Sequence, residues 1–295
     1  MSGPSRSKHK FIVCLILLFS LLFSYGFSGE KRQESFITTL SPKIKAKVSQ
    51  YPNLVCGIYI KPSWISGRNN AISINGNTSF PAASLIKIPI AVVLLKKVDE
   101  NKISWNQTLT LKHYHYAQGA GLLRTKKAGT KFKLSEVFRL MLTISDNTAT
   151  NMIIDLLGGI SVVNQEITKL GLKNTKLNNW LGDFKGTNKT SPEDLVFILD
   201  ESLHGEILSK SSKRIFKDTL LEVKNKSLIK QGLGKYTKFA HKTGTIGICV
   251  GDAGIIYYPR GKRLSLSVIV KRPFNSLQGQ KLIREVSNII YNEHR

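Results

Sequence analysis

Three short stretches of the chain carry residue types that could perform nucleophilic catalysis together. The first is Ser84-Leu85-Ile86-Lys87, in which a serine precedes a lysine by three positions. Residues three apart lie on one face of a helix, so the lysine amine can reach the serine hydroxyl. A partly desolvated amine can take the hydroxyl proton and make the serine a nucleophile. The same spacing recurs at Ser5, Ser7, Ser28 and Ser227, but Ser84 differs in its Phe80-Pro81-Ala82-Ala83 approach and in the apolar helix that would bury the lysine stem.

The second stretch is Ser145-Asp146-Asn147, at the junction of two expected helices. A hydroxyl here can pass a proton to a leaving group, and the Asn147 amide can both donate and accept hydrogen bonds. The same three residues are also good helix-cap chemistry. Two interpretations therefore stay open, a plain cap or a proton shuttle beside a substrate-binding amide.

The third stretch is Lys242-Thr243-Gly244-Thr245, on an expected strand that ends in a turn. Gly244 permits close approach of a substrate backbone. The amide of Thr245 could join that of Ser84 as an oxyanion hole, while Lys242 and Thr243 could hold a carboxylate. The alternative is an edge strand whose lysine discourages aggregation.

Hydrophobic patterning predicts strands near both ends of the chain and helices between them. Strands are expected over residues 54–60, 71–74, 239–243, 253–258 and 264–270, with turns over 246–251 and 259–261. Helices are expected over residues 42–50, 84–98, 134–144, 148–157, 162–170, 209–223 and 278–291, with a further one starting at Ser191. The strands can form one antiparallel five-stranded sheet flanked by the terminal helices. The fold class is therefore α+β, with an inserted all-α lobe over about residues 84–222.

The order of the three motifs resembles the class A β-lactamase and penicillin-binding-protein superfamily, over roughly residues 40–293. The resemblance implies the same two-lobed fold and a serine hydrolase that opens β-lactam rings. It implies that Ser84 attacks the lactam carbonyl and becomes acylated. Lys87 would accept or relay the proton, and Ser145 would pass it to the leaving nitrogen.

The same resemblance implies a binding role for the remaining motif residues. Asn147 would bind the side-chain amide of the substrate. The substrate carboxylate would be held by Lys242, Thr243 and Thr245, with Gly244 allowing the close approach. The expected ligands are a small-molecule β-lactam or a peptidoglycan-derived substrate.

The chain departs from the family in the loop after the helical lobe. Class A enzymes carry a glutamate there that activates the water for deacylation, but here Leu181 follows Trp180 and the loop is short. Asp183 is a candidate substitute base, and the alternative is an exposed loop acid. Loss of one general base costs about 10²–10⁴-fold in rate, so slow deacylation is expected. Arg272 is the nearest candidate for a family arginine beside the Lys242 strand.

The N-terminus has the pattern of a secretory signal peptide, predicted over residues 1–28. Basic residues precede the apolar run at positions 11–24, and small residues follow it. Export to the periplasm or beyond is expected, with the mature domain over residues 29–295; an uncleaved membrane anchor is the alternative. Cys56 and Cys249 are expected to be buried free thiols rather than a disulfide.

The chain is strongly basic, with 44 Lys and Arg against 19 Asp and Glu and a formal charge of +25. Loose, salt-dependent association with anionic envelope surfaces is expected, or simply a lysine-rich surface. Scattered bases without a recognisable module argue against specific nucleic-acid binding. No metal or cofactor is expected, because metal-ligand spacings are missing from the sequence, and a monomer is expected. The alternatives to a β-lactamase are a peptidoglycan-directed acyl-transfer or esterase-type hydrolase and a covalent β-lactam-binding sensor.

Overall fold

The protein is built around one antiparallel sheet whose strands come from both ends of the chain. The structure, a computed structural model, describes residues 36–65 and 70–293. The five strands lie in the order β2-β1-β9-β8-β7, with every neighbouring pair antiparallel. Their bounds are β1 Val55–Pro62, β2 Ile72–Ile74, β7 Lys238–Ile246, β8 Cys249–Tyr257 and β9 Arg263–Lys271. The edge strand β7 carries the Lys242 motif.

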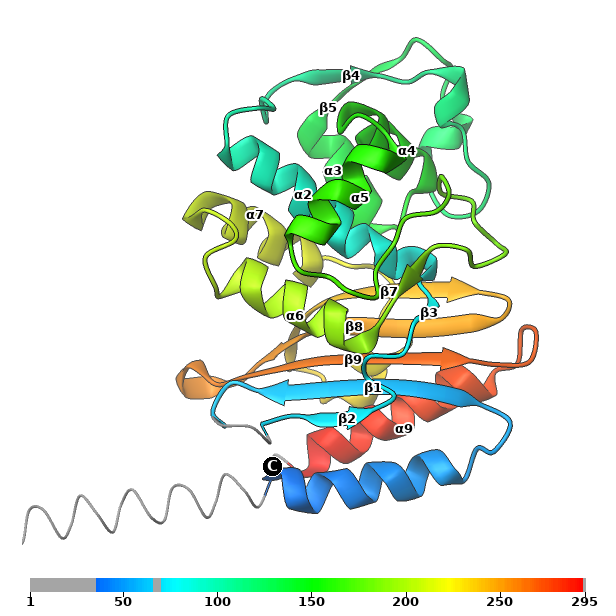
Figure 1. Ribbon diagram of the computed structural model, residues 1–295, viewed down its shortest axis with the longest axis vertical. Helices are drawn as coiled ribbons and strands as arrows, with labels where there is room; N and C mark the ends of the chain where they lie inside the picture. Colours follow the sequence, from blue (N-terminus) through cyan, green and yellow to red (C-terminus); the bar gives the residue numbers. More distant parts are fainter. Residues whose placement is uncertain (1–35, 66–69, 294–295) are drawn as a thin grey trace, which may run out of the picture.

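Helices from the two chain ends cover one face of this sheet. The helical segment over residues 36–49 and α9 (Gln278–Glu293) lie side by side beneath the sheet (Figure 1). Their apolar side chains, among them Leu40, Ile44 and Leu282, are fully buried in a core shared with the sheet. The short helix α8 (Ile229–Gly232) packs against α9. The spacing of Leu40 and Ile44 at i and i+4 directs both onto the sheet.

The other face of the sheet carries the helical lobe (Figure 1). Its central helix is α2, in which every residue from Lys87 to Leu95 is buried, as its almost uninterrupted apolar sequence requires. Helix α6 packs on the sheet, and the others surround α2. Their bounds are α2 Lys87–Asp99, α3 Leu134–Thr143, α4 Asn147–Leu156, α5 Ile160–Lys169, α6 Pro192–Leu203 and α7 Lys210–Leu221. Two small ribbons complete the lobe, β3 (Phe80–Pro81) with β6 (Lys189–Thr190) and β4 (Thr108–Thr110) with β5 (Lys131–Lys133).

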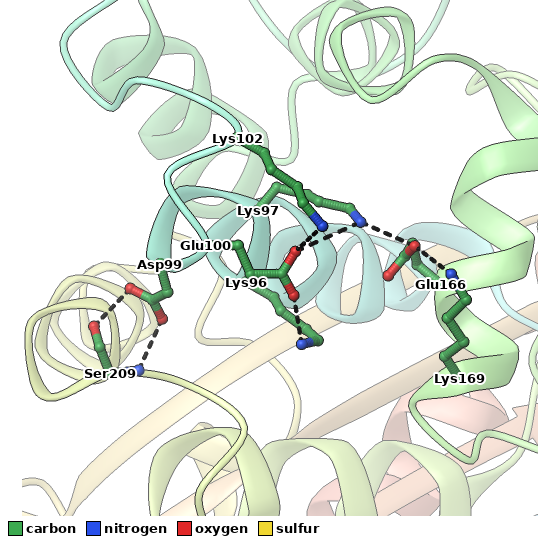
Figure 2. Close-up of polar contacts among 8 residues, drawn as sticks. All are labelled: Lys96, Lys97, Asp99, Glu100, Lys102, Glu166, Lys169 and Ser209. Carbon is green, nitrogen blue, oxygen red and sulfur yellow. Dashed lines mark hydrogen bonds and ion pairs between the residues drawn. The ribbon is translucent and has the colours of Figure 1, made fainter.

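A cluster of charges joins the C-terminal end of α2 to its neighbours (Figure 2). Glu166 of α5 lies 2.9 Å from the Lys97 amine and 3.0 Å from that of Lys169. Asp99 accepts hydrogen bonds from the Ser209 backbone N–H and hydroxyl, at 2.8 and 2.6 Å, where α7 begins. Glu100 is bonded to the surrounding lysines as well. These contacts tie the C-terminal end of α2 to α5 and to the start of α7.

The predicted α+β architecture with an antiparallel five-stranded sheet and a helical lobe is confirmed, although the lobe predicted as all-α also holds the short strands β4, β5 and β6. Two element bounds also differ. The turn predicted over residues 246–251 is present but shorter, covering only residues 247–248, because β7 runs to Ile246 and β8 already begins at Cys249. The first helix also covers residues 36–41, ahead of its predicted start, because Phe36 and Leu40 extend the apolar stripe. Cys56 and Cys249 are free and buried, as expected. The predicted signal peptide lies outside the described residues, and among the described ones no helix is long and apolar enough to cross a bilayer.

Candidate active site

Ser84 lies where the chain leaves β3 and turns toward the helical lobe. It belongs to a single 3₁₀ turn, η1 (Ala83–Ile86), that runs directly into α2 at Lys87. Ala83 adopts a positive φ of 45°, which bends the backbone sharply just before the serine. The turn places Ser84 and Lys87 on the same side, and the two side-chain heteroatoms are 3.1 Å apart.

Lys87 is the hub of the site and is fully buried. Its Nζ lies 2.7 Å from the Ser145 carbonyl oxygen, 2.7 Å from Asn147 Oδ1 and 3.1 Å from Ser145 Oγ. Burial, and next the charge of Lys242, hold the pKa of Lys87 well below its usual range, while Asp146 opposes the shift.

This geometry suits a neutral Lys87 amine. The carbonyl oxygen of Ser145 and the amide oxygen of Asn147 can only accept hydrogen bonds. A neutral amine has two N–H groups, and these two acceptors use both. Its lone pair is then left for the two hydroxyls at 3.1 Å, those of Ser84 and Ser145. The arrangement can therefore take a proton from one hydroxyl and return it through the other.

The turn that carries Ser145 combines the two interpretations left open by the sequence. Asp146 is the cap of α4, because its carboxylate accepts the Ala149 N–H at 2.8 Å. Its other oxygen accepts the N–H groups of Leu122 and Leu123 at 2.6 and 2.9 Å. Ser145, at a positive φ of 61°, is left facing Lys87. The capping residue and the proton-shuttle candidate are thus neighbours rather than alternatives.

The edge strand β7 closes the opposite side of the site. Lys242 is 1% exposed, and its Nζ donates to the Thr243 carbonyl oxygen at 2.7 Å. Burial lowers the pKa of Lys242 to about 7, against the raising effect of Asp252 on the neighbouring strand. A β-carbon on Gly244 would lie 3.0 Å from the backbone nitrogens of both Ser84 and Leu85. Glycine is therefore needed for β7 to pack against the serine turn.

The three motifs meet around one cavity of about 320 Å³. Its walls include Ser84, Ser145, Lys242, Thr243 and Thr245. Asn147 is connected to this site by the hydrogen bond that its amide oxygen accepts from Lys87. The amide nitrogen of Asn147 donates to the Gln118 carbonyl oxygen at 2.8 Å. The predicted motif residues thus lie together, although three distant parts of the chain supply them.

The loop between α5 and α6 places Asp183 away from these contacts. Its carboxylate accepts the Thr187 hydroxyl at 2.9 Å and the Asn188 N–H at 2.7 Å, which close the loop on itself. Within the described residues, no hydrogen bond joins Asp183 to Ser84 or Lys87. Asp183 is half-buried and engaged rather than a free exposed acid.

Leu181 is buried at the position where the resemblance implies a glutamate. Asn151 of α4 fixes it there, since Asn151 Oδ1 accepts the Leu181 N–H at 2.8 Å. The sequence analysis did not identify Asn151. The only signal was its place one turn after Asn147, on the same face of the helix.

Two residues near β7 have structural partners. His241 pairs with the buried Asp252 at 2.9 Å and stacks on Phe239, which agrees with a structural role. Arg272 donates to the carbonyl oxygens of Ser276 and Ile246, at 2.7 and 3.1 Å, and so braces the end of β7. Residues 36–65 and 70–293 contain no group of three or more metal-ligating side chains.

The fold and the cleft together are those of a two-lobed serine hydrolase, with a serine and a lysine paired where the helical lobe begins. A family model described as the β-lactamase enzyme family matches residues 39–294. The chain therefore belongs to this family and is a serine β-lactamase-like hydrolase.

Comparisons with individual proteins agree with this assignment. β-Lactamase VEB-1 of Pseudomonas aeruginosa is 24% identical, over 94% of this chain and 96% of its own. Extended-spectrum β-lactamase PER-1 of the same organism is 27% identical over 74% and 76%. Two solved structures of PBP-A superpose with a TM-score of 0.83 at 43% identity, covering 88% of this chain and 96–97% of theirs. One of these is a leucine-to-glutamate mutant in an acyl-enzyme complex with penicillin G.

Proposed function

We propose that the protein opens β-lactam rings by acylation of Ser84, with Lys87 as the proton acceptor. The observation that carries this proposal is the fully buried Lys87 amine, 3.1 Å from the hydroxyls of both Ser84 and Ser145. A desolvated amine with a lowered pKa is the base that a serine nucleophile requires.

The acylation step balances with the residues of the cleft. Ser84 Oγ attacks the lactam carbonyl carbon while its proton passes to Lys87. The carbon–nitrogen bond then breaks, and the proton reaches the ring nitrogen through Ser145. Amide N–H groups of Ser84 and Thr245 hold the oxyanion in the meantime.

The substrate is held by the remaining motif residues. Asn147 binds its side-chain amide, while Lys242, Thr243 and Thr245 receive its carboxylate beside Gly244. Burial lowers the pKa of Lys242 to about 7. A negatively charged substrate carboxylate beside this amine favours its protonated form and so restores its positive charge.

Hydrolysis of the acyl-enzyme is slow in this proposal. Leu181 offers no base, and both oxygens of Asp183 are engaged within the loop. For Asp183 to act as the deacylation base, it would first have to release Thr187 and Asn188. This favours a second candidate, a penicillin-binding-protein-like acyl transfer on wall peptides or a covalent sensor. The penicillin G acyl-enzyme of the PBP-A leucine-to-glutamate mutant supports acylation by a β-lactam on a related chain.

The protein acts outside the cytoplasm in this proposal. Residues 1–28 direct export, and the domain at 29–295 then works as a monomer in the periplasm or beyond. Removal of 1–28 takes three basic residues and no acids, so the excess of 44 bases over 19 acids largely persists. Such a charge favours salt-dependent contact with anionic envelope surfaces.

Burst analysis with nitrocefin tests the function. We expect one equivalent of product in a burst, followed by slow turnover, and no burst from Ser84→Ala. Fast steady turnover would instead show an efficient β-lactamase, and no reaction would favour a wall-peptide substrate. Full activity of the alanine variant would refute the assignment of the nucleophile.

A further inference from the structure

A second, larger cavity lies outside the catalytic cleft and is lined mainly by the segment that connects α5 to α6. Its volume is about 810 Å³. Its charged lining residues are all lysines, Lys173, Lys176 and Lys189, and apart from Leu172 the rest is small or polar, including Ser79, Asn174 and Thr168. We name it the lysine groove and define it by these six residues.

Two of these lysines are placed directly opposite one another. Lys176 and Lys189 form an antiparallel bridge in which each backbone N–H donates to the other's carbonyl oxygen, at 3.0 and 2.9 Å. Side chains of such a pair point to the same face, about 5 Å apart at their β-carbons, and like charges there destabilise the pairing. Lys189 turns its amine to the Gly186 carbonyl oxygen at 2.8 Å, whereas Lys176 is exposed and forms no side-chain bond with a described residue.

The backbone beneath the groove is held firmly. Asp194 of α6 accepts the N–H groups of Lys173 and Asn174, at 3.3 and 2.7 Å, and the Thr175 hydroxyl at 2.7 Å. These bonds engage both oxygens of the Asp194 carboxylate, while the Lys173 and Lys176 side chains are exposed. The groove therefore carries its lysines on a fixed backbone, and none of the three forms an ion pair with an acid among the described residues.

We propose that the lysine groove binds a linear polymer of polyol phosphodiesters. Lysine recognises a phosphate as a point charge, whereas planar carboxylates are better matched by arginine, and the groove has none. The lining contains no aromatic ring on which a nucleobase could stack, which disfavours single-stranded nucleic acid. Hydroxyls and amides between the lysines suit the hydroxyl groups of a polyol. A phosphodiester between Lys176 and Lys189 relieves their repulsion.

The test measures binding of a fluorescent poly(glycerol phosphate) oligomer to the full-length protein at low and moderate salt. Replacing Lys173 and Lys176 by glutamine should weaken binding about tenfold or more and flatten the salt dependence. The matched control removes two exposed lysines, Lys45 and Lys281, from the helical layer on the other face of the sheet. It should weaken binding less than about twofold. An equal loss of binding affinity in the two double variants would refute binding at the lysine groove.

Two further measurements separate the groove from a generally basic surface. Lys176→Thr should raise the thermal unfolding midpoint while it weakens binding, because it removes the opposed charges. A lower midpoint together with unchanged binding would contradict the proposal. Polyglutamate and a single-stranded oligonucleotide of equal charge should bind more weakly than the polyol phosphate. Binding of either as tightly as the polyol phosphate would overturn the assigned ligand class.

Discussion

At the scale of single residues, the chemistry depends on which of two buried amines carries a proton. Lys87 must be neutral to accept the proton of Ser84, whereas Lys242 must be charged to attract a carboxylate. Both are buried, and each positive charge disfavours the other, as the lowering effect of Lys242 on the pKa of Lys87 shows. The site therefore has a limited pH range in which both conditions hold.

Acylation efficiency should consequently follow a bell-shaped pH profile. It rises as Lys87 loses its proton, at a pH well below the usual range of a lysine, and falls as Lys242 loses its own above about 7. Stopped-flow acylation from about pH 5 to 10 measures both limbs. In Lys242→Arg the falling limb should disappear, because a guanidinium stays charged throughout. An unchanged falling limb in that variant would show that another group controls it.

Leu181 provides a second test at this scale. A glutamate there would stand at the position where the resemblance implies the deacylation base, on a loop that Asn151 already holds in place. Leu181→Glu should accelerate deacylation by about 10²-fold, the lower end of a general-base contribution. Leu181→Gln has the same shape without the basic carboxylate and should leave deacylation slow. Mass spectrometry of the acyl-enzyme over time measures both rates, and equal rates in the two variants would argue against a missing base.

At the scale of elements, the sequence predicted most helices and strands because each buries one regular apolar face. It also predicted the motif residues of the cleft, since their spacing within each motif is local. Beyond the helix cap at Asp146, it could not predict the bonds of Asp146 to residues 122 and 123 or that of Asn151 to Leu181, because these partners lie on other segments and obey no spacing rule. Nor could it find the lysine groove, because only the bridge between Lys176 and Lys189 brings those charges together.

Asp146 links α4 to the segment at residues 122–123 through one carboxylate, and its loss should be costly. It is fully buried and accepts three backbone N–H groups, from α4 and from residues 122 and 123. In Asp146→Asn one oxygen becomes an NH₂ group that faces a donor, whichever way the amide turns. We expect a loss of about 2 kcal/mol or more in the free energy of unfolding. Urea unfolding measures it, with the exposed Asp218→Asn of α7 as control. Equal effects would contradict the anchoring role.

At the scale of the whole molecule, charge sets the limits of stability. The chain carries +25 at neutral pH, and neutralising all its carboxylates would bring the charge of Lys and Arg alone to +44. Acid therefore adds self-repulsion while it removes ion pairs. The charge cluster at the end of α2 loses stability in acid. The surrounding lysines hold the pKa of Glu100 at about 2 and that of Glu166 below its usual value, so protonating either carboxylate costs the fold these ion pairs.

Glu166 should stabilise the fold without affecting catalysis. Its hydrogen bond from Lys97 is the main cause of its lowered pKa, so its contribution is full above about pH 4.5 and is lost as the pH falls through the folded value. Glu166→Gln should cost about 1–3 kcal/mol at pH 7, and the difference from wild type should shrink in acid. Urea unfolding at both pH values measures this, with the exposed Glu206→Gln as control.

The burst amplitude per folded molecule should stay unchanged in Glu166→Gln, because Lys97 lies at the opposite end of α2 from Lys87. If the difference in the free energy of unfolding between wild type and Glu166→Gln persisted in acid, the packing of Glu166, and not its charge, would hold α5 against α2.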